Sequence, residues 1–359
     1  MKLGNEYYQL VKKYRRDLHQ IPEIGFDLSE TSAYLKRELS AMGYQCEEVA
    51  KTGIIAIKEG KEPEAIAFRA DMDGLMIDEK TNHDFQSRHH GLMHACGHDG
   101  HMAILLGFAN FLTTISKPKK TIILLFQPAE ESPGGAKVII ESGLFDRYPI
   151  EAIFAVHLDP SIEEDKIGLI SGAMMAQSGE LDVIIQGKSA HGGKPHLGSD
   201  AIIATSQLIN SYQTIISRNL DPLKPGVITI GKITGGDARN IIASQVMISG
   251  TIRAFDINQY QLIKKRISKI NDAIMYDVEM DTDIRDFYPP VINDDYLYQK
   301  VKNCLSKDEY QEIKPSMLAE DFSYYQQKVP GLLMMLGIGN EKKGHINPLH
   351  SSYFDFDEI

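Results

Sequence analysis

The sequence has few cysteines, no long apolar run and no excess of positive charge. Its three cysteines, Cys46, Cys96 and Cys304, are too few and too widely spaced for a disulfide framework, which fits a reducing compartment. No run approaches the roughly 18 apolar residues that a bilayer span requires, and the N-terminal segment lacks the apolar stretch of a signal peptide. We therefore expect a cytoplasmic protein with no membrane partner.

The charge balance is acidic. The formal net charge is −11 at pH 7, so the field around the protein repels phosphate backbones and attracts cations. Nucleic acid is therefore not expected as a partner. Hydrophobic residues make up 43% and charged residues 24% of the 359 residues, which is ordinary for a folded protein, and this length exceeds what one hydrophobic core usually holds. Two domains are expected.

The first part of the chain alternates predicted helices and strands. Runs such as TIILLF are apolar on both faces, which is typical of parallel strands between helix layers. The predicted helices are 6–19, 29–42 with Ser29 as N-cap, 100–111 and 135–141, and the predicted strands are 54–57, 65–68, 121–126 and 152–156. The pattern predicts an α/β domain with a mostly parallel sheet between helices.

The pattern changes after residue 176. Residues 177–287 read as strand, helix, strand, strand, helix, strand, the β-α-β-β-α-β order of a ferredoxin-like domain, with helices over 200–216 and 258–275. From residue 288 the earlier alternation resumes, with a helix over 294–304, the stretch 319–327 and the buried strand LLMMLGIG. We therefore expect a discontinuous first domain, 1–176 and 288–359, into which residues 177–287 are inserted.

Side chains that bind metals follow four of the predicted strands. They are Asp71 and Asp73, Glu130 and Glu131, His157, and His345 and His350, and the segment MHACGHDGHM adds His94, Cys96, His98, Asp99 and His101. In open α/β sheets ligands gather outside the carboxyl ends of strands, and imidazole, thiolate and carboxylate bind zinc, manganese, cobalt or nickel. Since one ion needs about four ligands, this set predicts two divalent ions. Two neighbouring ions polarise a carbonyl and ionise a water, which favours hydrolysis.

Glu130 and Glu131 are adjacent at the end of their strand. On an irregular turn the two side chains diverge, so one carboxylate can bind metal while the other acts as general base toward a water. The spacing leaves open which glutamate does which. A single histidine at a strand end is more often structural, as His94 and His101 are expected to be, but the joint pattern favours a metal site.

Seven segments carry a resemblance to a known family. In order along the chain they are RRDLHQIPEIGF, FRADMDGL, MHACGHDGH, FQPAEES, AVHLD, GTIRAF and PLHSSYFDFDE. They resemble, in the same order, the aminoacylase and carboxypeptidase metallohydrolase family. The similarity is greatest to its amidohydrolase branch, which contains hippurate hydrolase, indole-acetyl-amino-acid hydrolase and N-acetyldiaminopimelate deacetylase.

The resemblance implies roles that the spacing alone leaves open. The metal ligands that it implies are Cys96, His98, Glu131, His157 and His350, with Glu130 as general base and Asp71 as the carboxylate that orients a ligand from behind. Arg69 stands where many relatives outside this branch have a histidine ligand, and Cys96 is expected to replace that ligand.

In the inserted domain the resemblance implies a contribution to a second subunit. His191, in SAHGGKPHLGSDA, matches the residue that reaches a partner subunit's active site and holds the oxyanion. Asn240 and Arg253 match positions that bind the substrate carboxylate, for which the arginine fork is well suited. A homodimer formed through the inserted domain is thus implied.

The expected activity is hydrolysis of the amide bond of an N-acyl-L-amino acid. A narrower alternative is deacetylation of N-acetyl-L,L-diaminopimelate, because EESPGGAK resembles EEGPGGAK in that subgroup. Dipeptide cleavage is a further alternative, since it also breaks an amide. An alternative from another class is a non-catalytic binding protein that retains the fold, which the loss of the base or of a ligand would signal. The implied base and all five implied ligands are present in the sequence.

Overall fold

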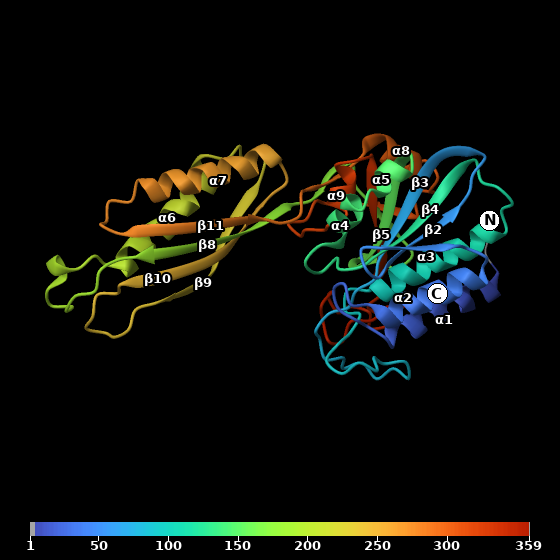
Figure 1. Ribbon diagram of the computed structural model, residues 1–359, viewed down its shortest axis with the longest axis horizontal. Helices are drawn as coiled ribbons and strands as arrows, with labels where there is room; N and C mark the ends of the chain where they lie inside the picture. Colours follow the sequence, from blue (N-terminus) through green and yellow to red (C-terminus); the bar gives the residue numbers. More distant parts are fainter. Residues whose placement is uncertain (1–3, 359) are drawn as a thin grey trace. The chain divides into compact units, whose positions relative to one another are not determined.

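The computed structural model describes residues 4–358, and its contacts divide the chain into two compact units (Figure 1). Unit 1 holds the chain up to Gly172, Ile292–Lys314 and the chain from Asp321 onward, and unit 2 holds Ala173–Val291 and Pro315–Glu320. No helix within residues 4–358 is long and apolar enough to cross a membrane. That residues 177–287 fold as a domain of their own stays a prediction.

Unit 1 is built around an eight-stranded sheet in the order β1-β2-β4-β3-β5-β14-β6-β13. The strands are β1 (Cys46–Val49), β2 (Gly53–Lys58), β3 (Glu62–Asp71), β4 (Lys120–Gln127), β5 (Ile150–Glu163), β6 (Ile167–Leu169), β13 (Tyr310–Glu312) and β14 (Gly331–Gly339). The neighbours β4, β3, β5 and β14 run parallel, whereas β1 and β2 are antiparallel to their neighbours. The predicted mostly parallel sheet is confirmed, but the short strands β1, β6 and β13 were not predicted.

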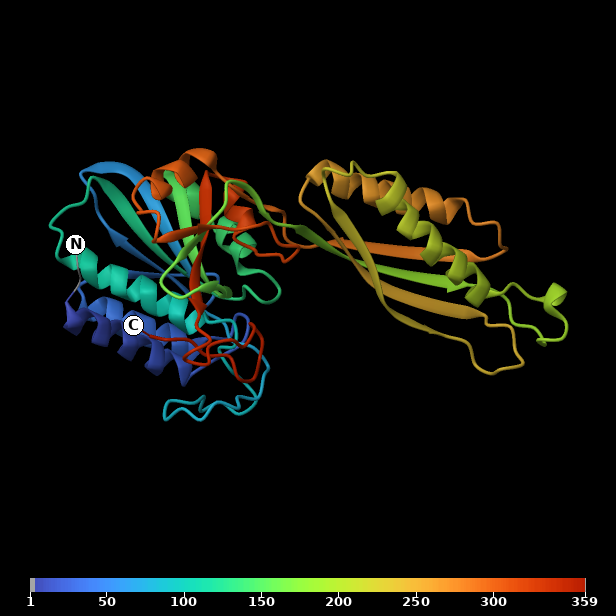
Figure 2. The same cartoon turned by 180° about the vertical axis from the view of Figure 1, so that it is seen from behind.

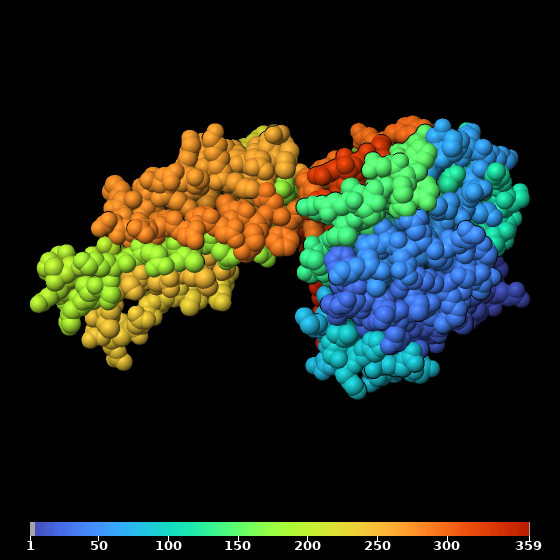
Figure 3. Space-filling model, in the orientation of Figure 1, coloured from blue at the N-terminus to red at the C-terminus, as the bar shows by residue number. Residues whose placement is uncertain are grey.

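Helices lie on both faces of this sheet (Figure 1 and Figure 2). The helices of unit 1 are α1 (Asn5–His19), α2 (Ser29–Ala41), α3 (His98–Thr113), α4 (Gly135–Glu141), α5 (Leu144–Arg147), α8 (Asp295–Lys302) and α9 (Ser323–Gln326). The first three pack on one face, where Leu18, Leu35 and Leu106 are fully buried in one apolar core. The N-terminal helices, in blue, and the segment 76–92, in cyan, form much of the surface of unit 1 in the space-filling view (Figure 3).

One predicted helix begins differently in the structure, for a physical reason. Ser29 is the first residue of α2 and not its N-cap. The carboxylate of Glu23 accepts hydrogen bonds from the N–H groups of Glu30 (3.2 Å) and Thr31 (2.9 Å) in its place. The stretch 319–327, to which the sequence assigned no element type, contains α9, and the carboxylate of Asp321 before it is held in a buried network beside the sheet.

Unit 2 contains a four-stranded antiparallel sheet in the order β11-β8-β10-β9. Its elements are β8 (Gln177–Gln186), the 3-10 turn η1 (Pro195–Leu197), α6 (Ala201–Arg218), β9 (Gly226–Gly235), β10 (Gln245–Ala254), α7 (Ile257–Asp272) and β11 (Glu279–Asp286). The order and directions match the predicted ferredoxin-like arrangement. Asp286 pairs with Gly179, so the chain enters and leaves this sheet on neighbouring strands.

The two helices of unit 2 share one apolar core with its sheet. Leu208 of α6 and Ile263 of α7 are fully buried together with Leu181, Val183 and Ile248 of the strands. The carboxylate of the residue before each helix accepts backbone hydrogen bonds from the first turn, which is ordinary N-capping. In the segments that cross between the units, β7 (Gly172–Met175) and β12 (Val291–Asn293) form a two-stranded sheet.

Candidate metal centre

Four neighbouring strands of unit 1 bring the predicted ligands to one edge of the sheet. β3 ends at Asp71, β4 leads into the turn with Glu130 and Glu131, β5 carries His157, and β14 runs into the loop with His350. Because these strands are parallel neighbours, their carboxyl ends meet at the same edge. Cys96 and His98 reach this edge at the start of α3, where Gly97 adopts φ +85° and turns the chain into the helix.

The five predicted ligands lie together. Cys96 Sγ is 3.5 Å from His157 Nε2, and His350 Nε2 is 3.3 Å from Glu131 Oε1. The donor atoms of Cys96, His98 and His157 lie within 4.8 Å of one another, as do those of Cys96, Glu131 and His350. Cys96 thus belongs to two groups of three donors, which is the arrangement that two ions with one bridging ligand require.

Glu130 adds a carboxylate beyond these five donors. It belongs to a third group with His98 and Glu131, and its Oε2 lies 4.0 Å from His98 Nε2. Glu130 is buried, whereas the side chain of His350 is 51% exposed. The cluster is therefore shielded from solvent on the side of Glu130 and exposed on the side of His350, where a small molecule can reach it.

The protonation of the donors fits a cation site. Burial and the neighbouring glutamates raise the pKa of the Cys96 thiol well above its usual value. Burial lowers the pKa of His98, but the carboxylates of Asp71 and Asp73 outweigh this effect and raise it to about 10. His98 Nδ1 lies 3.5 Å from Asp73 Oδ1. A buried thiol and a buried imidazole amid carboxylates are the groups that a divalent cation deprotonates and binds.

Hydrogen bonds behind the cluster fix the imidazoles. His157 Nδ1 bonds to the carbonyl oxygen of Leu158 (2.8 Å), which leaves Nε2 for a ligand. His101 Nε2 accepts from the Leu158 N–H (2.9 Å), so its Nδ1 carries the proton donated to Asp71 Oδ1 (2.5 Å). Although Asp71, His98 and His101 also lie within reach of a common point, His101 has no free lone pair and supports the site instead of binding an ion. His94, which was also expected to be structural, is buried and belongs to no donor group among the described residues.

Asp71 contacts the cluster from behind. Its Oδ2 lies 3.7 Å from His98 Nε2 and accepts a hydrogen bond from Arg69 Nη1 (2.8 Å). Burial raises the pKa of Asp71, but His101, His98 and Arg69 together hold it well below its usual range. The carboxylate is therefore ionised, and its position agrees with the orienting role that the sequence implied.

Three supporting residues received no role from the sequence, and a fourth, Asp73, was predicted only as a metal-binding side chain at a strand end. Gln127, Asp321 and Tyr325 form a buried network with Arg69, in which Asp321 Oδ1 accepts from Arg69 Nη2 (2.9 Å) and Gln127 Oε1 accepts from Tyr325 Oη (2.9 Å). Asp73 accepts hydrogen bonds from the backbone N–H groups of the two glutamates at the cluster. Asp73 and Gln127 lie in segments that carry the family resemblance, but their supporting roles depend on partners from distant segments or from the backbone.

The predicted residues of the inserted segment fall into two places within unit 2. His191 and Asn240 lie side by side, since the Gly192 N–H donates to the Asn240 carbonyl (2.7 Å). Arg253 lies near the other end of β10, opposite Ser178, and its Nη1 donates to the Met317 carbonyl (2.9 Å). The eight residue steps from Gln245, at the start of β10, to Arg253 span about 25 Å. Unit 2 therefore brings His191 and Asn240 together and keeps Arg253 apart from them.

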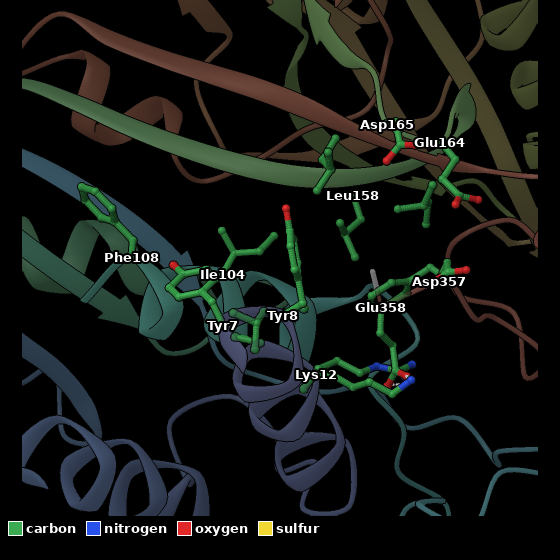
Figure 4. A pocket seen from close by; sticks show the side chains of 18 of the residues that line it. Tyr7, Tyr8, Lys12, Ile104, Phe108, Leu158, Glu164, Asp165, Asp357 and Glu358 are labelled. Atoms are coloured by element: carbon green, nitrogen blue, oxygen red, sulfur yellow. Dashed lines mark hydrogen bonds and ion pairs between the residues drawn. The ribbon is translucent and has the colours of Figure 1, made fainter. Parts of the chain in front are cut away.

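A large apolar cavity in unit 1 is not the candidate site. It measures about 540 Å³ and lies between α1, α3, β14 and the segment 356–358, lined by Tyr8, Ile104, Phe108 and Leu158 among others (Figure 4). None of the predicted ligands lines it. Because it lacks convergent metal-binding groups, we assign the chemistry to the cluster at the strand ends.

The fold and the cluster define a class, that of α/β proteins with a buried centre for divalent ions and a spare carboxylate. Such a centre is typical of metal-dependent hydrolases. The sequence matches Peptidase family M20/M25/M40 over residues 67–359. The chain belongs to this family, and the resemblance inferred from the seven segments is confirmed.

Relatives cover nearly the whole chain. It is 40% identical to N-acetyldiaminopimelate deacetylase of Bacillus licheniformis, over 90% of this chain and 88% of that protein. It is 36% identical to IAA-amino acid hydrolase ILR1-like 4 of Arabidopsis thaliana, over 99% and 83%. Among solved structures, the Bacillus subtilis YXEP protein, described as a dinuclear metal binding peptidase of the M20 family, superposes with a TM-score of 0.87 at 29% identity over 99% and 94%.

Proposed function

We propose that this protein hydrolyses the amide bond of N-acyl-L-amino acids with the help of two divalent ions. The observation that carries the proposal is the cluster of five donors with the buried carboxylate of Glu130 beside them. The names of the relatives support the substrate class, since one is a deacetylase and the other an amino acid hydrolase. The products are the carboxylate of the acyl group and a free amino acid.

Cys96, His98, Glu131, His157 and His350 would hold the two ions. When bound, such ions polarise the scissile carbonyl and lower the pKa of water. Manganese, zinc, cobalt and nickel all suit this mixture of thiolate, imidazole and carboxylate. Asp71 would hold the metal-binding side chains in place through its contacts with His101 and His98. The thiol ligand also supports a cytoplasmic location, because Cys96 is a free cysteine that an oxidising compartment would endanger.

Glu130 would act as general base and then as general acid. Its carboxylate takes a proton from the attacking water and delivers it to the nitrogen of the leaving amine as the C–N bond breaks. Burial keeps this proton from exchanging freely with solvent. His191 would donate a hydrogen bond to the carbonyl oxygen as negative charge develops there, and Asn240 and Arg253 would bind the substrate carboxylate.

The separation of these last residues supports a homodimer through unit 2. A small substrate cannot touch both ends of a strand segment about 25 Å long. If His191 and Arg253 both contact one substrate, they must come from different subunits. A symmetric dimer meets this requirement at both of its sites.

The general base is tested by Glu130→Gln. We expect the variant to keep two equivalents of manganese, measured by mass spectrometry, and to lose at least about 10²-fold in kcat on N-acetyl-L-amino acids, because glutamine cannot take a proton. Glu59→Gln, at an exposed glutamate, serves as control. Turnover near that of the unmodified protein in metal-loaded Glu130→Gln would refute the mechanism. No hydrolysis by the unmodified, metal-loaded protein would favour a binding protein.

The acyl group is tested by a substrate panel. The segment EESPGGAK and the 40% identity to a deacetylase favour N-acetyl-L,L-diaminopimelate as a second candidate substrate. Acetyl-, benzoyl- and indole-acetyl-amino acids, N-acetyl-L,L-diaminopimelate and a dipeptide should be compared by kcat/KM. A preference for the diaminopimelate derivative of tenfold or more, equivalent to about 1.4 kcal/mol, would assign the narrower activity.

Shared sites are tested by mixing two inactive variants. His191→Ala subunits retain Glu130, and Glu130→Gln subunits retain His191. After the subunits exchange, half of the dimers are mixed and each has one complete site, so about a quarter of the full activity should return. If the mixture stays inactive although mixed dimers form, His191 acts within its own subunit. If His191→Ala alone is active, His191 does not hold the oxyanion.

A further inference from the structure

Asp73 lies directly beneath the two glutamates of the cluster. It follows β3 by two residues, and β3 and β4 are parallel neighbours in which Asp71 stands opposite Gln127. The segments that continue from these strands therefore run side by side, with Asp73 against the turn that carries Glu130. Asp73 is 1% exposed, its Oδ1 also lies 3.5 Å from His98 Nδ1, and among residues 4–358 it belongs to none of the groups of donors that could hold an ion.

Both oxygens of Asp73 bind the backbone of this turn. Oδ1 accepts a hydrogen bond from the Glu130 N–H (3.0 Å), and Oδ2 accepts one from the Glu131 N–H (3.1 Å). One planar carboxylate thus holds two consecutive amides, and the peptide plane between them cannot rotate without breaking a bond. Charge-assisted hydrogen bonds of this kind are stronger than those between neutral groups.

The turn needs such a restraint. Ala129 adopts φ +58°, a conformation that a residue with a side chain rarely takes, and the Gly134 and Gly135 N–H groups both converge on its carbonyl (3.0 and 2.9 Å). The two side chains that follow Ala129 both reach the cluster, since Glu130 Oε2 lies 4.0 Å from His98 Nε2 and Glu131 Oε1 lies 3.3 Å from His350 Nε2. A small rotation of the Glu130–Glu131 peptide would move both carboxylates at once.

We propose that Asp73 is a positioning residue that holds the general base and the metal ligand as one unit, by binding the amides of Glu130 and Glu131 with its two carboxylate oxygens. The inference rests on the proposed function for the identity of base and ligand. Only a carboxylate satisfies the geometry, because it offers two acceptors and no donor. An asparagine would present its NH2 group to one of the two N–H groups.

The test compares Asp73→Asn with Asp256→Asn in the full-length chain. Asp256 also accepts two backbone amides, those of Asn258 and Gln259, but caps α7 in unit 2. Three quantities are measured: cobalt affinity and the thiolate-to-cobalt absorption band, kcat and KM with an N-acetyl-L-amino acid, and the unfolding temperature without metal.

For Asp73→Asn we expect cobalt affinity to fall at least tenfold with a changed absorption band, and kcat to fall about 10²-fold with KM within about threefold. Asp256→Asn should match the unmodified protein in cobalt affinity, band and kcat. Cobalt binding and kcat like those of the unmodified protein in Asp73→Asn would overturn the proposal. So would a lowered unfolding temperature with an unchanged band and kcat, because that result describes a purely structural residue.

A second variant and the cobalt measurement cover the two cases in which Asp73→Asn alone would not decide. If Asp73→Asn does not fold, Asp73→Glu keeps the charge and both acceptors but moves them by one methylene group, and the same loss of kcat and change of band is expected. An unchanged Asp73→Glu would then refute the proposal. If the unmodified protein hydrolyses no N-acyl amino acid, the proposed function fails, but the cobalt comparison still decides whether Asp73 positions Glu131.

Discussion

Glu79 lies outside the seven segments that carry the family resemblance and links α1 to the loop before the metal ligands. Its Oε1 lies 3.2 Å from His19 Nε2, its Oε2 accepts from the Ser87 N–H (2.7 Å), and the Thr81 hydroxyl also donates to it. Burial alone raises the pKa of Glu79, but these hydrogen bonds outweigh it and lower the pKa from 4.5 to about 2. The folded state therefore prefers the ionised glutamate.

The shift predicts a loss of stability in acid. Because the folded pKa is below the unfolded one, the contribution of Glu79 is complete above pH 4.5 and disappears as the pH falls through about 2. Discounted for partial solvent screening, it amounts to about 2 kcal/mol. Urea unfolding of the metal-free protein should find Glu79→Gln less stable by this amount at pH 6, and the gap should narrow toward pH 3. A gap that is constant with pH, or a similar gap in the exposed control Glu59→Gln, would contradict the assignment.

Single residues also mark the limit of what the sequence predicts. The donor types of Cys96, His98 and His157 and their places at strand ends could be read from the sequence, because imidazole and thiolate have few other reasons to cluster there. The roles of Asp73 and Asp321 could not, since both act on backbone amides or on side chains far along the chain. The sequence also did not predict which ligand is exposed to solvent. In the structure it is His350.

The turn between β4 and α4 is the element on which the site depends most. It begins at Pro128, passes through Ala129 and the two glutamates, and returns at Gly135, whose backbone lies against the Pro128 carbonyl. A Cβ atom on Gly135 would lie 1.8 Å from that carbonyl oxygen, which no rotamer change relieves. The turn must therefore open if any side chain is placed there.

Gly135→Ala should lower both stability and metal binding. We expect a loss of about 2 kcal/mol in the free energy of unfolding without metal, together with weaker manganese binding, because Glu131 moves with the turn. Urea unfolding and metal analysis give the two quantities. Gly231→Ala, where a Cβ meets nothing within 4 Å, should change neither. Normal manganese affinity in Gly135→Ala would show that the turn tolerates the added methyl group.

Elements were predictable where their pattern was long. The apolar strands β4 and β14 and the amphipathic helices α1 and α6 match the predicted ranges within a few residues. β6 and β13, of three residues each, carry too little pattern to be seen, and their pairing depends on segments far apart in the sequence. The predicted helix over 258–275 ends at Asp272 instead, because helix ends depend on capping contacts that a periodic pattern does not encode.

At the scale of the whole molecule, all five proposed ligands belong to unit 1. Metal binding should therefore stabilise unit 1 and leave unit 2 unchanged, by on the order of 3 kcal/mol when free metal is about 100 times the dissociation constant. Calorimetry should resolve two transitions, of which a chelator lowers one. Leu208→Ala in the core of unit 2 identifies the other. Equal shifts of both transitions on chelation would contradict this division.

The adjacent entry and exit strands of unit 2 also bear on how the metal centre assembles. Asp286 pairs with Gly179, so once unit 2 has folded, the stretch of chain between His157 and His350 is shortened by residues 180–285. The entropy lost on closing a chain segment grows with its free length, and a folded insertion removes most of that length beforehand. Unit 2 would thus act as a folding aid for unit 1, and the last ligand should find its partners sooner when the insertion folds first.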